Sequence, residues 1–242
     1  MSTIASAMGR RLAALHQSLS PAEQANLKLI LGLSAGRLVP DKQAGSEAGR
    51  TAVSEALELL CPYDVPDPRG VQYRGRPAFL TDDLLGVLID EAEQVGRTAV
   101  PFDEHYLGCG GPVADRLATS RELAELVAGV VPKAVATGVA SYLFYRDPGQ
   151  GIIPHIDTDI FSLNVLMMLV HDHPPGDPSP SALYMHFPDG TDQRLQLTPG
   201  EVVIFLAGTQ AHSRTPIAEN ERVTILTFGF MPEGAPLENY RR

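Results

Sequence analysis

The second half of the chain, from about residue 134, is a series of short β-type runs separated by proline-glycine turns, and this pattern restricts the fold most. Asp-Pro-Gly, Pro-Pro-Gly, Pro-Asp-Gly and Thr-Pro-Gly lie between the runs. In such turns proline presets φ and glycine permits conformations that other residues avoid. The predicted strands cover 139–145, 161–170, 181–187, 194–197, 201–206 and 222–230. Strands at this spacing predict a sandwich or jelly roll.

The first half is predicted to be mainly helical. Helix-start patterns, in which a hydroxyl side chain precedes acidic or regularly spaced apolar residues, begin at Ser20, Thr81 and Thr119. A further short helix is expected over 51–60, and the proline-rich stretch 61–77 is expected to be irregular. The sequence therefore predicts an α+β protein. Residues 1–133 would form a helical region that supports and caps a β-rich core, residues 134–242, within one structural unit.

Composition narrows the functional classes. The chain has 242 residues, of which 44% are hydrophobic, so it can bury a substantial core. A formal net charge of -10 argues against nucleic acid and anionic membranes as partners. No apolar run is long enough to span a bilayer, and the first residues lack the apolar run of a secretory signal. With only Cys61 and Cys109, a disulfide framework is not expected, and the cytoplasm is the expected location. The sequence gives no indication of oligomeric state.

A possible metal site lies in the strand-rich half. His155 and Asp157 are two residues apart, so in an extended strand they share one face. A third ligand could be His212, which follows the apolar run 201–206. Two histidines and one carboxylate are the set that binds non-haem Fe(II) and leaves positions open for a cosubstrate and O₂. The His-x-Asp pattern alone also fits a pair of surface loop residues.

A possible carboxylate receptor follows the third ligand. Arg222 comes ten residues after His212, and Thr224 shares its face of the predicted strand. A guanidinium beside a hydroxyl suits a carboxylate, because arginine offers a planar, permanently charged fork. The alternative is that Arg222 lies at an exposed strand end and that Thr224 is present for its β propensity.

Residues 142–231 resemble the core of the Fe(II)- and 2-oxoglutarate-dependent dioxygenases, especially the prolyl-hydroxylase-like branch. The matching positions are His155, Asp157, His212, Arg222 and Thr224, with Tyr145 ten residues before the first histidine. The resemblance implies a double-stranded β-helix fold, with the two histidines and Asp157 holding Fe(II). It also implies that Arg222, Thr224 and Tyr145 bind 2-oxoglutarate, which is decarboxylated with O₂ to succinate and CO₂ while a substrate is oxidised. Because Asp157 is present, hydroxylation, desaturation or ring formation is favoured over chlorination. The resemblance does not extend to the first half of the chain.

Other polar residues are weaker candidates. Arg214 shares a face with His212 and could meet a substrate carboxylate, and Asp159 could touch substrate. Arginines of the helical half could reach over the barrel mouth; these are Arg74, Arg76 and Arg116. The cluster His171-Asp172-His173 is interpreted as part of a loop between strands rather than as a second metal site.

The leading functional hypothesis is a hydroxylase of a small molecule, such as an amino acid or a biosynthetic intermediate. A peptidyl hydroxylase of the prolyl type is the alternative, since the motif spacing is closest to that branch. A nucleic-acid demethylase fits less well with the acidic balance and with an aromatic content of only 6%. A cupin-like module that binds metal without catalysis would give Arg222 no role.

Overall fold

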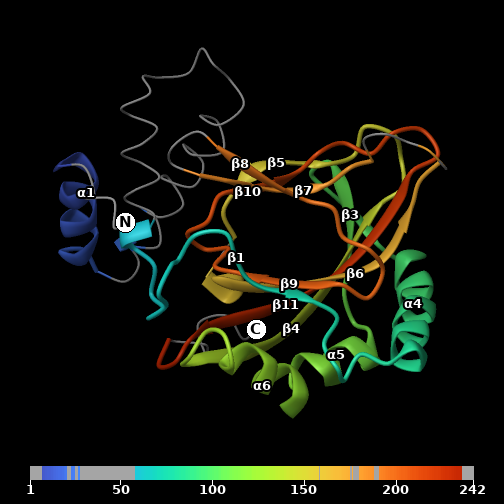
Figure 1. Cartoon of the computed structure of the whole chain (residues 1–242), viewed down its shortest axis with the longest axis horizontal. Helices are drawn as coiled ribbons and strands as arrows, with labels where there is room; N and C mark the ends of the chain where they lie inside the picture. The colour runs from blue at the N-terminus through green and yellow to red at the C-terminus, as the bar shows by residue number, and fades with distance from the viewer. Residues whose placement is uncertain are drawn as a thin grey trace.

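Two antiparallel sheets face each other in the computed structural model, and helices cover the outer face of the larger sheet (Figure 1). The structure describes residues 7–20, 23, 24, 27, 58–157, 159–174, 176, 180–187 and 191–235. In spatial order, the seven-stranded sheet contains β1 (Val71–Gly75), β9 (Val202–Phe205), β6 (Leu163–Asp172), β11 (Arg222–Pro232), β4 (Ala134–Tyr145), β3 (His105–Gly108) and β2 (Val100–Phe102). The four-stranded sheet contains β5 (Ile152–His155), β10 (His212–Arg214), β7 (Leu183–His186) and β8 (Asp192–Leu195). This is the jelly-roll arrangement predicted from the turn pattern.

The described helices are α1 (Ala7–Gln17), α4 (Asp82–Gly96), α5 (Pro112–Ala118) and α6 (Arg121–Ala128), and a 3-10 turn, η1 (Asp159–Phe161), follows β5. Thr81 caps α4 as predicted, because its side chain accepts a hydrogen bond from the backbone N–H of Leu84. The predicted cap of the next helix was wrong by one residue. Ser120, not Thr119, caps α6, because Thr119 ends the preceding helix α5, which the sequence patterns had not indicated.

Some helical predictions fall largely outside the described residues. These are the helix expected after Ser20 and the helix over 51–60, of which residues 58–60 are described. The capping contact itself is present, since the carboxylate of Glu23 accepts hydrogen bonds from the backbone N–H and the hydroxyl of Ser20. The stretch 61–77 is not wholly irregular, because β1 lies within it and pairs with β9. Three strands of the first half, β1, β2 and β3, therefore join the larger sheet.

Alternation along β11 separates two hydrophobic cores. Val223 and Ile225 pack between the sheets, in a cluster that includes Tyr145. Leu226 and Phe228 pack on the other face, in the cluster that includes side chains of α4, α5 and α6. The residues of β11 thus point alternately into the barrel and toward the helices, which decides where its polar side chains lie.

Two further expectations concern thiols and membranes. Cys61 is half-buried and Cys109 is exposed, and no disulfide joins them. Among the described residues, no helix is both long and apolar enough to span a bilayer.

Candidate metal centre

A pair of short strands places the two predicted histidine ligands together. In the antiparallel pair β5–β10, His155 lies directly opposite His212, and the centroids of their rings are 4.2 Å apart. Neither strand was among the predicted ones. Both are only three or four residues long, and β5 contains a proline, so they carry little strand signal.

The predicted carboxylate completes the cluster. Asp157 follows β5, and its backbone N–H donates to the carbonyl of Ala207 at 2.8 Å, which fixes the chain at this point. Its Oδ1 lies 3.4 Å from Nε2 of His155 and 3.6 Å from Nε2 of His212. One ligand atom from each of the three residues lies within 4.8 Å of the others, and no other such group occurs among the residues that the structure describes.

Hydrogen bonds on the outer side of the three residues orient their ligand atoms toward one another. Nδ1 of His155 lies 2.8 Å from the carbonyl oxygen of Ile153, and Nδ1 of His212 lies 3.0 Å from that of Gln210. When Nδ1 donates to a carbonyl, the proton is held there and the lone pair of Nε2 is free for a metal ion. Asn164 donates from Nδ2 to Oδ2 of Asp157 at 2.7 Å, so Oδ1 remains on the inner side. This donor set fits a divalent metal ion.

Without a metal, the electrostatics of the cluster favour an ionised Asp157 and a neutral His212, whereas Asp157 favours the protonated form of His155. Burial lowers the pKa of His212 to about 4, and the nearby His155 adds to this shift. Burial would raise the pKa of Asp157, but its interactions with His212 and His155 and the hydrogen bond from Asn164 outweigh burial, and the pKa is lowered. Burial would lower the pKa of His155, but the hydrogen bond and charge of Asp157 raise it. At neutral pH the cluster therefore offers a carboxylate and a neutral, buried imidazole.

Arg214 lies inside the barrel, next to this cluster along β10. Its side chain is 4% exposed, and Cζ lies 5.4 Å from the ring centroid of Tyr145. Nη2 donates to the hydroxyl of Ser181 at 2.8 Å, while the buried Nε has no hydrogen-bond partner. The sequence prediction that Arg214 shares a face with His212 agrees with this placement.

Arg222 and Thr224 do not point toward the metal cluster, contrary to the expectation that they bind 2-oxoglutarate there. Both lie on the face of β11 that looks toward α4, where they line a cavity of about 300 Å³. The Arg222 side chain is 54% exposed and pairs with Asp172 at 3.0 Å. The expected shared face is present, but strand alternation turns it away from the barrel interior, into which Val223 and Ile225 point. Tyr145 does lie in the interior, as 1% of its surface is exposed and it packs in the inner cluster.

The predicted substrate arginines of the first half are not brought to the cluster. Arg74 lies in β1 and pairs with Glu201 at 3.2 Å. Arg76 pairs with Asp82 at 2.6 Å, at the start of α4. Arg116 is exposed on α5, the helix that packs against the outer face of the larger sheet (Figure 1). Asp159 begins η1, and its side chain lies outside those that the structure describes.

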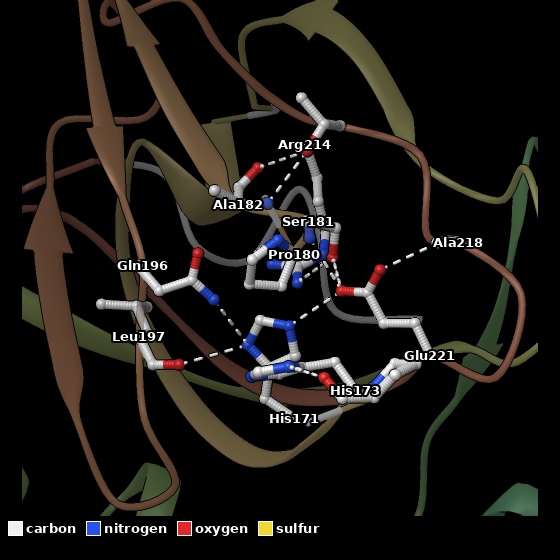
Figure 2. A network of polar contacts seen from close by, with 12 residues as sticks. His171, His173, Pro180, Ser181, Ala182, Gln196, Leu197, Arg214, Ala218 and Glu221 are labelled. Carbon is white, nitrogen blue, oxygen red and sulfur yellow. Dashed lines mark hydrogen bonds and ion pairs between the residues drawn. The ribbon is translucent and has the colours of Figure 1, made fainter. Parts of the chain in front are cut away.

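His171, which the sequence analysis placed in a loop rather than in a second metal site, belongs to a polar network. His171 lies at the end of β6 rather than in a loop, and its Nε2 is 2.9 Å from Oε1 of Glu221. Figure 2 shows the Glu221 carboxylate between His171 and Ser181, whose hydroxyl and backbone N–H both donate to the same oxygen. The network continues through Ser181 to Arg214.

Two residues that the sequence patterns did not single out belong to the site. Asn164 orients Asp157, and its only signal is a polar residue within an apolar strand. His105 is buried on β3 and stacks on Tyr145 with ring centroids 5.4 Å apart, while its Nδ1 has no hydrogen-bond partner. Burial lowers the pKa of His105 to about 4, so the ring is neutral. Its sequence surroundings gave no signal of this, because Tyr145, on which it stacks, lies on β4 and is distant in sequence.

Comparison with solved structures supports the same architecture. The epimerase SnoN of nogalamycin biosynthesis, a non-haem alpha-ketoglutarate-dependent enzyme, is 14% identical with a TM-score of 0.55, over 68% of this chain and 77% of SnoN. A Pseudomonas putida prolyl-4-hydroxylase is 18% identical with a TM-score of 0.52, over 65% and 91% of the two chains. HygX of Streptomyces hygroscopicus, with nickel, 2-oxoglutarate and hygromycin B bound, is 13% identical with a TM-score of 0.54, over 68% and 84%. The chain has the fold of the 2-oxoglutarate oxygenases.

The similarity to these solved structures confirms the double-stranded β-helix expected from the sequence. No family model matches the sequence, and no curated protein matches it significantly. The likeness in fold is therefore much greater than the likeness in sequence. Within the double-stranded β-helix, the cluster of His155, Asp157 and His212 is held by the four-stranded sheet and the segment that follows β5.

Proposed function

We propose that this chain is an Fe(II)- and 2-oxoglutarate-dependent oxygenase that oxidises an unactivated C–H bond of a small molecule, with release of succinate and CO₂. The observation that carries the proposal is the convergence of His155, Asp157 and His212 in a double-stranded β-helix. Two imidazoles and one carboxylate bind Fe(II) while leaving positions open, which a cosubstrate and O₂ require. When bound, Fe(II) with 2-oxoglutarate and O₂ supplies the oxidising power for the C–H bond.

The chain's own residues supply orientation and exclusion of water. His155 and His212 present Nε2 because carbonyl groups hold their Nδ1 atoms, and Asn164 holds the carboxylate of Asp157. The side chain of His212 is 6% exposed, whereas that of His155 is 31% exposed. The cluster is therefore closed on the His212 side and open on the His155 side. A substrate would approach past His155.

The small-molecule class draws support from the relatives in structure. SnoN belongs to nogalamycin biosynthesis, and HygX has been crystallised with hygromycin B. An amino acid or a biosynthetic intermediate is the substrate class we assign. Peptidyl hydroxylation is the second candidate, because the structural match covers 91% of the Pseudomonas putida prolyl-4-hydroxylase.

The proposal is tested by anaerobic addition of Fe(II) and 2-oxoglutarate to the full chain. We expect a visible metal-to-ligand charge-transfer band in the wild type and its loss in His155→Ala and Asp157→Ala. His173→Ala is the matched control, because this exposed histidine lies outside the cluster. If the wild type shows no band, the oxygenase proposal is wrong.

Substrate class is tested by turnover. Free amino acids and natural-product intermediates are compared with proline-containing peptides, using succinate release and the mass of the product as readouts. A mass gain of one oxygen on a free small molecule supports the first candidate. The same gain on a peptide, with none on small molecules, supports the second.

A further inference from the structure

A cavity of about 300 Å³, here called the outer cavity, lies between the second half of α4 and the outer face of the larger sheet. α4 covers this face next to β4 and β6 (Figure 1). Phe144, Thr224 and Val170 lie in one row, because Thr224 of β11 pairs with Phe144 of β4 and with Val170 of β6. Directly opposite residues on neighbouring strands point to the same side of a sheet. These three residues therefore form the floor of the outer cavity, on the far side of the sheet from the barrel interior.

The hydroxyl of Thr224 is the polar group of this floor. Thr224 is 7% exposed, and its hydroxyl has no hydrogen-bond partner in the part of the chain that the structure describes. Its Oγ1 is not fully enclosed by protein, so the hydroxyl opens into the cavity. A valine would fill the same place between Phe144 and Val170 without a polar atom to satisfy. The hydroxyl is therefore placed to bind a polar group of a ligand.

Three arginines lie around the outer cavity, in a chain whose formal net charge is -10. Arg97 is the C-cap of α4, Arg146 directly follows β4, and Arg222 is the first residue of β11. Glu93 is the acidic residue of the lining. The lining thus carries an excess of positive charge, which attracts anions.

Two of these guanidinium groups lack an acidic partner. Arg222 pairs with Asp172 at 3.0 Å. No carboxylate oxygen of the described residues lies within 4.0 Å of the guanidinium of Arg97 or of Arg146. Nη1 of Arg146 donates to the carbonyl of Gly96 at 3.2 Å, which holds this side chain beside the cavity. The charges of Arg97 and Arg146 therefore remain available to an anion.

We propose that the outer cavity is a second binding site, which takes a small organic anion with a carboxylate or phosphate group on a compact apolar body. The anionic group lies among the three arginines and accepts a hydrogen bond from the Thr224 hydroxyl, because guanidinium groups match the geometry of both anions. The apolar body rests on Phe144 and Val170. A volume of about 300 Å³ is at the lower end of the range for small-molecule sites. The site is separate from the metal centre, and the inference does not depend on the proposed function.

The test uses the metal-free full chain and calorimetric titration. The probes are benzoate and phenyl phosphate, which carry the two anionic groups on the same ring. Benzyl alcohol is the neutral match, and inorganic phosphate is the match without an apolar body. At least one of the two organic anions should bind roughly 10-fold more tightly than both matches, as expected for charge-assisted hydrogen bonds. Its affinity should fall as the ionic strength is raised, because salt screens exposed charges.

Substitutions locate the bound anion. Arg97→Met should weaken binding of the anion by roughly 10-fold, and it removes no hydrogen bond or ion pair of the described chain. Thr224→Val keeps the shape of the side chain and should weaken binding by about 3- to 10-fold. Arg121→Met, on the exposed face of α6, is the matched control and should bind as the wild type does. The melting temperature of each variant, measured without the probe, separates loss of binding from loss of folding.

The outcomes decide between this site and its alternatives. If neither organic anion binds more tightly than the two matches, the inference is wrong and the arginines are surface charges only. Wild-type affinity in both Arg97→Met and Thr224→Val would place the anion elsewhere and would also overturn the inference. His155→Ala should keep the wild-type affinity for the probe, and a loss there would place the anion at the metal centre instead.

Discussion

His155 and His212 are direct partners across the antiparallel pair β5–β10, and their ring centroids lie 4.2 Å apart. A single interstrand pair therefore positions two of the three residues of the candidate metal centre. A one-residue slip of β10 would turn His212 to the other face, because side chains alternate along a strand. Met185 pairs with His212 on the other side of β10 and is fully buried, which helps to fix the register.

Removal of either histidine should weaken metal binding severely. Loss of an outer contact typically lowers metal affinity by about 10- to 100-fold, and loss of a ligand should exceed that. We expect His155→Ala and His212→Ala each to lower the affinity for Fe(II) or Ni(II) by more than about 100-fold in calorimetric titration. His173→Ala should bind as the wild type does. Wild-type affinity in His212→Ala would remove this histidine from the ligand set.

Asn164 should act through Asp157. Its Nδ2 donates to Oδ2 of Asp157 at 2.7 Å, and without it the carboxylate can rotate away from the two imidazoles. Asn164→Ala is expected to lower metal affinity by about 10- to 100-fold, as outer contacts of metal ligands do. The melting temperature of the apo protein separates this effect from unfolding. If metal affinity stays at the wild-type value, the contact has only a packing role.

Much of the candidate site could be predicted from residue spacing, because the alternation of side chains along a strand depends only on neighbouring residues. His155 and Asp157 are two residues apart, and His212 and Arg214 are likewise, so strand alternation alone predicts which side chains share a face. Spacing does not say which face looks inward. Arg222 and Thr224 share a face as expected, yet that face packs toward α4, because Val223 and Ile225 fill the interior.

The site residue His105 and the strand β1, which the sequence did not predict, depend on contacts between residues that are distant in sequence. His105 reaches the site only because β3 pairs with β4 and carries it to Tyr145. The strand β1 has weak local signals and forms because β9 offers it an unpaired edge. Such pairings are decided by tertiary packing, which can override local propensity.

A second buried carboxylate joins two helices beneath the sheet. Glu91 of α4 accepts hydrogen bonds from the backbone N–H groups of Val113 and Ala114, at 2.6 and 2.9 Å, and from the hydroxyl of Tyr142 at 2.6 Å. Glu91 thus accepts hydrogen bonds from the backbone N–H groups at the start of α5, where the capping residue Gly111 has no side chain that could accept them. Buried donors left without a partner are costly.

Replacement of Glu91 should therefore destabilise the fold without changing metal affinity. We expect Glu91→Ala to lower the free energy of unfolding by about 3 kcal/mol, and Glu91→Gln by less, because the amide keeps one acceptor. Urea denaturation measures both. Glu93→Ala, on the exposed side of the same helix, should change stability by less than about 0.5 kcal/mol. Equal stability of Glu91→Ala and Glu93→Ala would contradict this account of the α5 start.

Glu221 should make stability depend on pH in the acid range. Burial would raise its pKa, but hydrogen bonds from the Ser181 hydroxyl, the Ala218 N–H and His171 outweigh burial and lower the pKa to about 2, from an ordinary value of 4.5. The unfolded chain then takes up the proton more readily than the folded one. The stabilisation is fully present above pH 4.5 and is lost as pH falls toward 2.

Glu221→Gln removes this titration. The free energy of unfolding should therefore depend on pH differently in the variant and in the wild type. At neutral pH the variant should be less stable than the wild type by about 3 kcal/mol, since each unit of pKa difference is worth about 1.4 kcal/mol. The difference should shrink between pH 4.5 and 2, because the wild type loses the charged hydrogen bonds that the variant already lacks. Chemical denaturation at a series of pH values measures it, with exposed Glu219→Gln as the matched control. A difference that stays constant down to pH 2 would show that the Glu221 carboxylate is not held in its charged form by this network.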